Sequence, residues 1–99
     1  MSVRLVISLQ ANAGKGADLL AEMEKRCVEV RKEPGCLQFE VFQSGSDPDR
    51  LCLLEHWQDQ AALDVHAGRN AQAPANPRMA ELRSDGPTQR EDYEYNRTR

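Results

Sequence analysis

The stretch PGCLQFEVFQSGSDPDRLCLLEHW, residues 34–57, predicts the β-hairpin that decides the fold. Apolar and polar residues alternate from Leu37 to Val41, which is the period of two expected for a half-buried strand. Residues 44–49 are rich in turn-forming side chains, so a second strand is expected over residues 50–57. The rest of the chain is expected to pack on this hairpin or to extend it.

The segments on either side of the hairpin predict further strands and helices. Apolar side chains at helical spacing follow a first strand and predict a long amphipathic helix, which Pro34 ends. Asp59 is a suitable N-cap for a second helix, and Pro77 suits the first position of one or two further helical turns. A break at residues 84–87 precedes a polar last strand. The predicted strands are 3–10, 37–43, 50–57 and 88–96, and the predicted helices are 17–32, 60–67 and 77–83.

This order predicts an α+β fold of ferredoxin-like β-α-β-β-α-β topology, in one domain that spans residues 1–99. Helices cover one face of the antiparallel sheet, and we assign the alternating apolar set of residues 37–41 to that face. The other face is expected to carry Val6, Phe42, Trp57 and the tyrosines without a helix above them. Because a large apolar face needs a cover, we expect a homodimer in which sheet packs against sheet.

Composition and charge exclude several classes of partner. The chain has a net charge of −3, with 13 basic and 16 acidic residues mixed along it, so no nucleic-acid surface is expected. The N-terminal apolar run is too short for a signal peptide or a membrane span, and a cytoplasmic protein is expected. Cys27, Cys36 and Cys52 lack the spacing of a dithiol motif and are expected to be reduced core residues.

Few residues remain as candidates for chemistry, because the chain has no phosphate-loop, dinucleotide, zinc-protease or nucleophile-elbow motif. His56 and His66 are too isolated to predict a metal site. Glu55 and Trp57 share a face of their strand; on the uncovered face, Glu55 would enter a semi-enclosed cavity where burial raises its pKa. Glu40, on the neighbouring strand, could enter the same cavity with a raised pKa. His66 is either a general base at the cavity mouth or a cap of the helix C-terminus.

The motifs P-G-C-L-x-F-E-V at 34–41 and L-L-E-H-W-x-D-x-A-A-L-D-x-H at 53–66 resemble the antibiotic biosynthesis monooxygenase domain family. Members of this family are small ferredoxin-like proteins that dimerise into an α+β barrel. The resemblance implies oxygenation of a small aromatic, quinol or polyketide-like phenol, bound inside the barrel, without metal, haem or flavin. In such chemistry the protein binds the phenol, helps to remove its proton and shields a carbanion-like intermediate that reacts with oxygen.

The resemblance also implies roles for individual residues. His66 is the expected proton acceptor, with Glu55 as its electrostatic partner or as a substrate hydrogen-bond acceptor. Trp57 is expected to stack on the substrate ring. Leu53 places an apolar group where an amide is expected, and Asn70 or Arg69 takes the place of a second histidine. The expected substrate-binding residues are Trp57, Glu40, Phe42, Leu53 and Asn70.

Two other functions fit the same fold. One is an isomerase or a haem-degrading relative, for which His66 is the candidate axial ligand. The other is a non-catalytic dimer that binds a small metabolite in the cavity without changing it.

Overall fold

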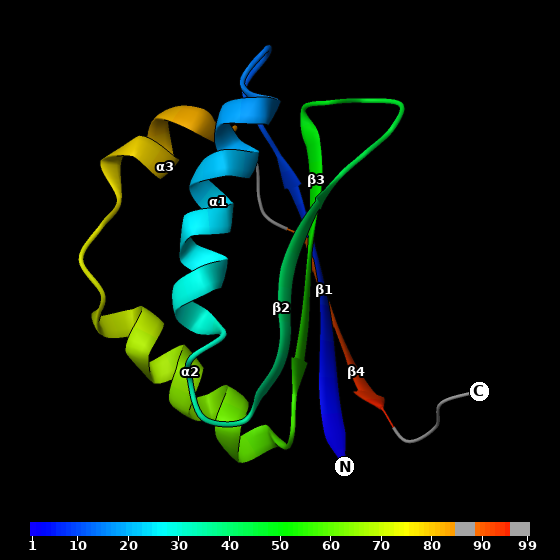
Figure 1. Ribbon diagram of the computed structural model, residues 1–99, viewed down its shortest axis with the longest axis vertical. Helices are drawn as coiled ribbons and strands as arrows, with labels where there is room; N and C mark the ends of the chain where they lie inside the picture. The colour runs from blue at the N-terminus through cyan, green and yellow to red at the C-terminus, as the bar shows by residue number, and fades with distance from the viewer. Residues whose placement is uncertain (85–88, 96–99) are drawn as a thin grey trace.

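A computed structural model describes residues 1–84 and 89–95 of the chain (Figure 1). The order of elements is β-α-β-β-α-α-β, so the third strand is connected to the fourth through α2 and the short α3, both of which the sequence predicted. The elements are β1 (Ser2–Gln10), α1 (Gly16–Val30), β2 (Cys36–Gln43), β3 (Arg50–Trp57), α2 (Gln60–Gln72), α3 (Pro77–Leu82) and β4 (Gln89–Tyr95).

The four strands form one antiparallel sheet in the order β2-β3-β1-β4. All three helices lie on the same side of this sheet (Figure 1). The ferredoxin-like fold predicted from the sequence is therefore confirmed. Since β3 is central, each of its side chains has cross-strand neighbours on both sides: Glu55 lies opposite Leu5 of β1 and Phe39 of β2.

The second helix is longer than the sequence predicted. Asp59 caps it as expected, accepting a 2.8 Å hydrogen bond from the backbone N–H of Ala62. The prediction that it ends near Ala67 is wrong, because Gly68 continues the helix and α2 ends at Gln72. A single glycine lowers helix propensity by about 1 kcal/mol without forbidding the conformation. The extra turn places Asn70 one turn beyond His66.

The other predicted boundaries differ by at most a few residues. Asn76 caps α3 through a 3.1 Å hydrogen bond from the Met79 N–H, with Pro77 at the first position as predicted. Of the predicted break at residues 84–87, only Ser84 lies within the described residues, and the predicted ends of the last strand, Thr88 and Asn96, lie outside them.

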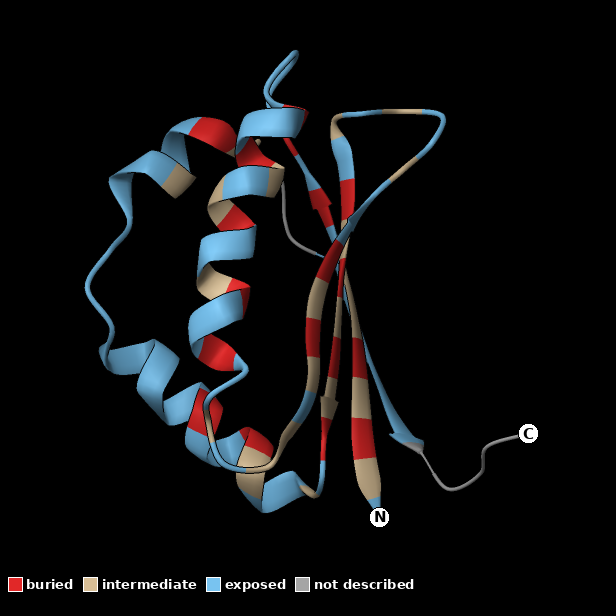
Figure 2. Cartoon of the chain, viewed as in Figure 1, coloured by how far each residue is buried: buried red, intermediate tan, exposed pale blue. Residues whose placement is uncertain are grey.

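The core lies between the sheet and the helices. Figure 2 shows the buried segments of α1 turned toward the strands. The helix contributes Leu19, Met23, Cys27 and Val30 to this core, at the spacing expected of an amphipathic helix. Burial raises the pKa of the Cys27 thiol to about 11, so this cysteine behaves as an apolar core residue.

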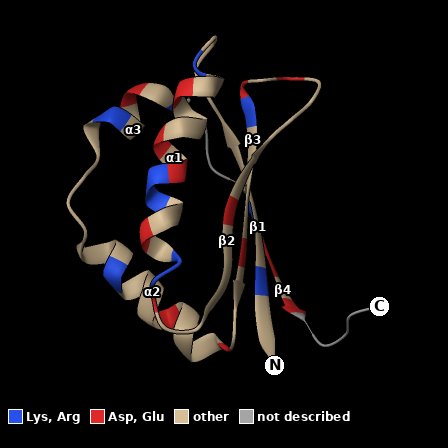
Figure 3. Ribbon diagram, viewed as in Figure 1, with Lys and Arg blue, Asp and Glu red and all other residues tan. Residues whose placement is uncertain are grey.

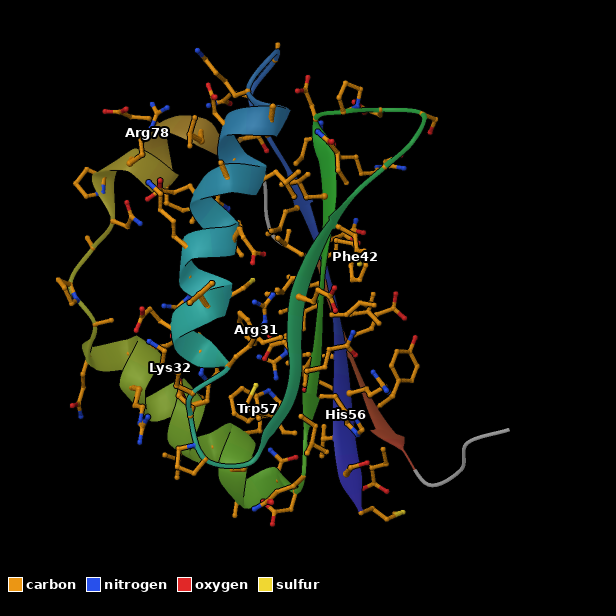
Figure 4. All side chains as sticks on the ribbon, in the orientation of Figure 1. Arg31, Lys32, Phe42, His56, Trp57 and Arg78 are labelled. Carbon is orange, nitrogen blue, oxygen red and sulfur yellow. The ribbon has the colours of Figure 1, made fainter. Side chains whose placement is uncertain are left out.

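Nothing in residues 1–84 and 89–95 covers the face of the sheet opposite the helices. Phe42 is 44% exposed there, and Figure 4 shows Phe42 and His56 on that side. The prediction that Trp57 shares this face is wrong. Trp57 points toward the helices (Figure 4) and is 0% exposed. Leu37 was predicted to face the helices, but it is exposed next to an irregularity in the β2–β3 register between Cys36 and Gln38.

Charged residues of both signs are scattered over the helices and strands (Figure 3). The ion pairs among them are mostly between exposed side chains, such as Glu29 near the end of α1 with Lys32 just after it. Such pairs contribute about 0–1 kcal/mol each. None of the helices in residues 1–84 and 89–95 is long and apolar enough to cross a membrane.

Candidate functional site

A cavity of about 460 Å³ lies between the sheet and the helices. The sheet supplies an apolar wall, and the helices together with the α2–α3 connection supply a mixed polar and apolar wall. The lining residues used below are Phe39, Leu53, Glu55, His66, Asn70 and Arg26. A volume of this size is within the range of pockets that hold a small organic ligand.

Glu55 is a carboxylic acid in the apolar wall of this cavity. Its neighbours across the sheet, Leu5 and Phe39, are both core residues, and Glu55 itself is only 4% exposed. Burial raises the pKa of this carboxyl, because the charged form loses its hydration. The hydrogen bond from Trp57 and the nearby His66 act in the opposite direction but are smaller effects. Glu55 therefore holds its proton to a higher pH than an exposed glutamate.

The Trp57 indole fixes the orientation of the Glu55 carboxyl. Its Nε1–H donates a 2.9 Å hydrogen bond to Glu55 Oε1, which two residues of equal parity on one strand can form because they share a face. The Trp57 ring also lies 4.7 Å, centroid to centroid, from the His66 imidazole. Trp57 does not line the cavity. It contacts Glu55 and His66 and so helps to hold these two cavity residues in position.

His66 reaches the cavity from α2 and is buried there, with 4% of its side chain area exposed. Its ring lies edge-on to Phe39, at 5.5 Å between centroids. The Nδ1 atom lies 3.1 and 3.2 Å from the two carboxylate oxygens of Glu33, which precedes the turn into β2. The alternative role for His66 as a helix cap is wrong, because α2 continues past it and its ring is packed against the sheet.

The second ring nitrogen of His66 is occupied by Asn70, one helical turn later. Asn70 Nδ2 lies 3.1 Å from His66 Nε2, and the side-chain oxygen of Asn70, Oδ1, accepts a hydrogen bond from Arg26 of α1. Arg26 therefore orients the amide so that its NH₂ group faces the imidazole. Both Asn70 and Arg26 line the cavity.

The structure brings together some of the residues that the sequence singled out and separates others. Leu53, Glu55, His66 and Asn70 line one cavity. Phe42 and Glu40 lie on the opposite face of the sheet, where Gln38 donates a 3.2 Å hydrogen bond to Glu40. The carboxylate hydrogen-bonded to His66 is that of Glu33 rather than Glu55.

Sequence reasoning missed Glu33 and Arg26. Glu33 was missed because 33 residues separate it from His66, and no spacing rule covers a contact across a helix and a hairpin. Arg26 was missed because a charged side chain fits the solvated face of the predicted amphipathic helix. Both residues belong to one chain of contacts, from Arg26 through Asn70 and His66 to Glu33.

No metal-binding cluster was found in the described part of the chain. Among residues 1–84 and 89–95, no group of three or more histidine, cysteine, aspartate and glutamate side chains is placed to hold a metal ion. Both nitrogens of His66 are already engaged, so ligation of a metal or of haem iron by this histidine requires displacement of Glu33 or Asn70.

Known structures share this architecture. A protein from Shewanella oneidensis is 29% identical over 93% of this chain and 88% of its own, with a TM-score of 0.78. A protein from Pseudomonas aeruginosa is 22% identical over 97% of this chain and 95% of its own, with a TM-score of 0.76. SnoaB, a cofactor-independent oxygenase from Streptomyces nogalater solved as a mutant, is 11% identical over 98% and 95% of the two chains, with a TM-score of 0.79.

The last two similarities lie below 25% identity and show the fold alone. Among curated proteins, no sequence matches this chain. The model of one family, described as antibiotic biosynthesis monooxygenase, matches residues 2–76, which include every cavity residue named above. The chain belongs to the antibiotic biosynthesis monooxygenase family.

Proposed function

We propose that this protein is a cofactor-independent monooxygenase of a small aromatic, quinol or polyketide-like phenol that binds between the sheet and the helices. The observation that carries the proposal is the pairing of two buried titratable side chains, His66 and Glu55, in the lining of one cavity of about 460 Å³. Ionisable side chains are seldom buried this deeply without a structural or chemical role. Membership of the family supports the same reaction class.

The cavity offers one group to remove a proton and another to hold an oxygen atom. In the neutral imidazole whose Nδ1–H donates to Glu33, Nε2 has a free electron pair and can accept the proton of a phenol O–H. Burial raises the pKa of Glu55, and in its protonated form this carboxyl can donate a hydrogen bond to a second oxygen of the substrate. Phe39, edge-on to His66, supplies an aromatic surface against the substrate ring.

Loss of the proton leaves its electron pair on the substrate, and the electron-rich ring then reduces oxygen directly. For an anthrone-like substrate the reaction balances as anthrone plus O₂ giving quinone plus water. One oxygen atom becomes the new carbonyl group, and the other leaves in water with the two hydrogens of the oxidised carbon. The substrate supplies all the electrons, so the protein needs to bind, deprotonate and shield it.

Oxygen consumption tests this proposal. Metal-stripped protein is mixed with a panel of hydroquinones and anthrone-like phenols, and O₂ uptake is compared with the autoxidation background. We expect uptake that falls about 100-fold or more in His66→Ala, because a general base contributes about 10²–10⁴-fold. Val65→Ala, which changes an exposed residue beside His66 on α2, is the matched control and should keep the wild-type rate. Uptake at the background rate across the panel would overturn the proposal.

The same preparation separates the two alternative functions. An isomerase would convert substrate without consuming O₂, and product analysis by mass spectrometry would show no added oxygen. For haem, we expect no Soret shift that depends on His66, because Glu33 and Asn70 already bond both ring nitrogens. A Soret shift in wild type that is lost in His66→Ala would favour a haem-degrading relative instead.

We further propose that the protein is a homodimer, as is expected for its family. The supporting observation is the sheet face opposite the helices, on which Phe42 and Tyr93 are about half exposed. A second copy packed against that face would cover side chains that no element of the described chain covers. Such packing would also leave the cavity on the helix side of each subunit.

A further inference from the structure

Glu33 has a position that its place in the sequence does not suggest. It lies in the connection between α1 and β2, outside both elements, yet only 15% of its side chain is exposed. Its backbone N–H bonds the Val30 carbonyl at 2.9 Å, and its own carbonyl accepts from Cys36 N–H at 3.2 Å. Gly35 allows the turn with φ of +79°, and its carbonyl accepts from Gln58 N–H at 2.9 Å. The carboxylate is therefore held in place by a well-bonded turn.

The contacts of Glu33 define which nitrogen of His66 carries the proton. A carboxylate can only accept, so the Nδ1 atom between the two Glu33 oxygens must be N–H. Nε2 then has the free electron pair, which matches the NH₂ group that Asn70 presents to it. Arg26 fixes the orientation of the Asn70 amide, because a guanidinium can only donate and therefore faces the amide oxygen. The donors and acceptors along this chain of contacts are therefore all consistent with the His66 tautomer that carries its proton on Nδ1.

We propose that Glu33 is a positioning residue that holds His66 in the Nδ1–H tautomer and thereby makes Nε2 the base of the cavity. The inference rests on the proposed function, because it specifies how the base of that reaction is prepared. When substrate binds, its O–H group replaces the Asn70 amide as the donor to Nε2. The proton then moves from the substrate oxygen to Nε2, the electron pair stays on that oxygen, and the resulting imidazolium is stabilised by the Glu33 carboxylate.

The surroundings of His66 are suited to this step. Glu33 also forms an ion pair with the exposed Arg69, whose Nη1 lies 3.7 Å from Glu33 Oε1. Arg26 of α1 and Glu55 of β3 line the same cavity as His66. Burial, together with the nearby charges of Glu33 and Glu55, raises the pKa of the Cys36 thiol of β2. The His66 ring itself packs against both Phe39 and Trp57, so its orientation is fixed by packing as well as by hydrogen bonds. Glu33 does not line the cavity and acts through His66 alone.

The test is the tautomer of His66, read from the ¹⁵N chemical shifts of the imidazole in labelled protein at a pH where the ring is neutral. We expect wild type to show a protonated Nδ1 and an unprotonated Nε2. In Glu33→Leu the signal should move toward the Nε2–H tautomer that predominates for a solvated histidine side chain. Glu29→Leu, one turn earlier and exposed, is the matched control and should leave the His66 shifts unchanged.

Several outcomes would overturn the inference. An Nε2–H tautomer in wild type excludes it directly, whether or not the variant folds. An unchanged tautomer in a folded Glu33→Leu protein, as judged by circular dichroism, excludes Glu33 as its cause. In the oxygen assay, kcat of Glu33→Leu should fall about 10- to 100-fold, a part of what a general base contributes, while KM stays near the wild-type value. If wild type consumes no oxygen, the proposed function fails and the NMR result still decides the role of Glu33.

Discussion

The indole N–H of Trp57 donates a 2.9 Å hydrogen bond to the carboxyl group of Glu55, and both side chains are buried between the sheet and the helices. The pair links the core to the cavity, since Trp57 is among the largest core residues and Glu55 lines the cavity wall. A change in Trp57 is therefore expected to affect both stability and the chemistry of Glu55.

Trp57→Phe removes the donor and leaves a smaller ring in the core. A buried acceptor without its donor and the accompanying loss of packing should together lower the free energy of unfolding by about 2–4 kcal/mol. Urea denaturation followed by circular dichroism measures this, because the chain has one tryptophan and the variant has no indole fluorescence. Val65→Ala, which is exposed, should change stability by less than about 0.5 kcal/mol. Equal stabilities for the two variants would show that the hydrogen bond and the packing of Trp57 contribute little.

Glu55→Gln should change how stability depends on pH. Burial raises the pKa of Glu55 above its ordinary value of 4.5, so the native state binds this proton more tightly than the unfolded state does. The stabilisation is complete below pH 4.5 and is lost as the pH rises through the native-state pKa. Glutamine keeps an oxygen that accepts from Trp57 but cannot ionise. The stability of the variant relative to wild type should therefore increase from pH 4 to pH 8, measured by urea denaturation at several pH values. A difference that is constant across this range would contradict the raised pKa.

Gly35→Ala should disturb the turn that carries Glu33. Gly35 has a φ of +79°, and a Cβ atom there would lie 2.6 Å from the Ala62 Cβ. The left-handed conformation alone costs a non-glycine residue about 1–2 kcal/mol, and the contact with α2 adds to this cost. Thermal unfolding of the variant should show the loss. Gly45→Ala, in open space, is the control and should leave the melting temperature close to that of wild type.

Phe42→Arg should weaken the proposed dimer without affecting the cavity. Phe42 is 44% exposed on the face opposite the helices, and a charge there would be buried by a second sheet. We expect wild type to sediment as a dimer at micromolar concentration and the variant to dissociate with a Kd raised about 10-fold or more. Val65→Arg, which places the same charge on exposed α2, should sediment like wild type. A wild-type monomer in this experiment would contradict the proposed assembly.

The amino-acid sequence by itself determined the order of elements and most of their bounds. The hairpin was predicted because alternation over residues 37–41 and a turn-rich segment leave little choice of local structure. The second strand of this hairpin, β3 (Arg50–Trp57), was predicted with both of its observed ends. Local signals also placed the Asp59 cap of α2 and Pro77 at the first position of α3, since such signals depend on residues within one turn of each other.

Tertiary structure decided which face of the sheet each side chain occupies. The sequence shows that Glu55 and Trp57 share a face, because the period of a strand is two, but it does not say which face. Strand register settles this: Glu55 lies directly opposite Leu5 and Phe39, which pack beneath the helices, and directly opposed residues point to the same side. This is why Trp57 is a core residue and Glu55 faces the cavity.

Tertiary structure also assembled the surroundings of His66. The sequence singled out His66 and Asn70, but the contact between them requires α2 to continue through Gly68, which local propensity disfavours without forbidding. The contact with Glu33 requires a turn and a helix that are distant along the chain to meet in space. Short-range patterns determined the elements of this protein, and long-range packing decided which of their polar side chains meet in its cavity.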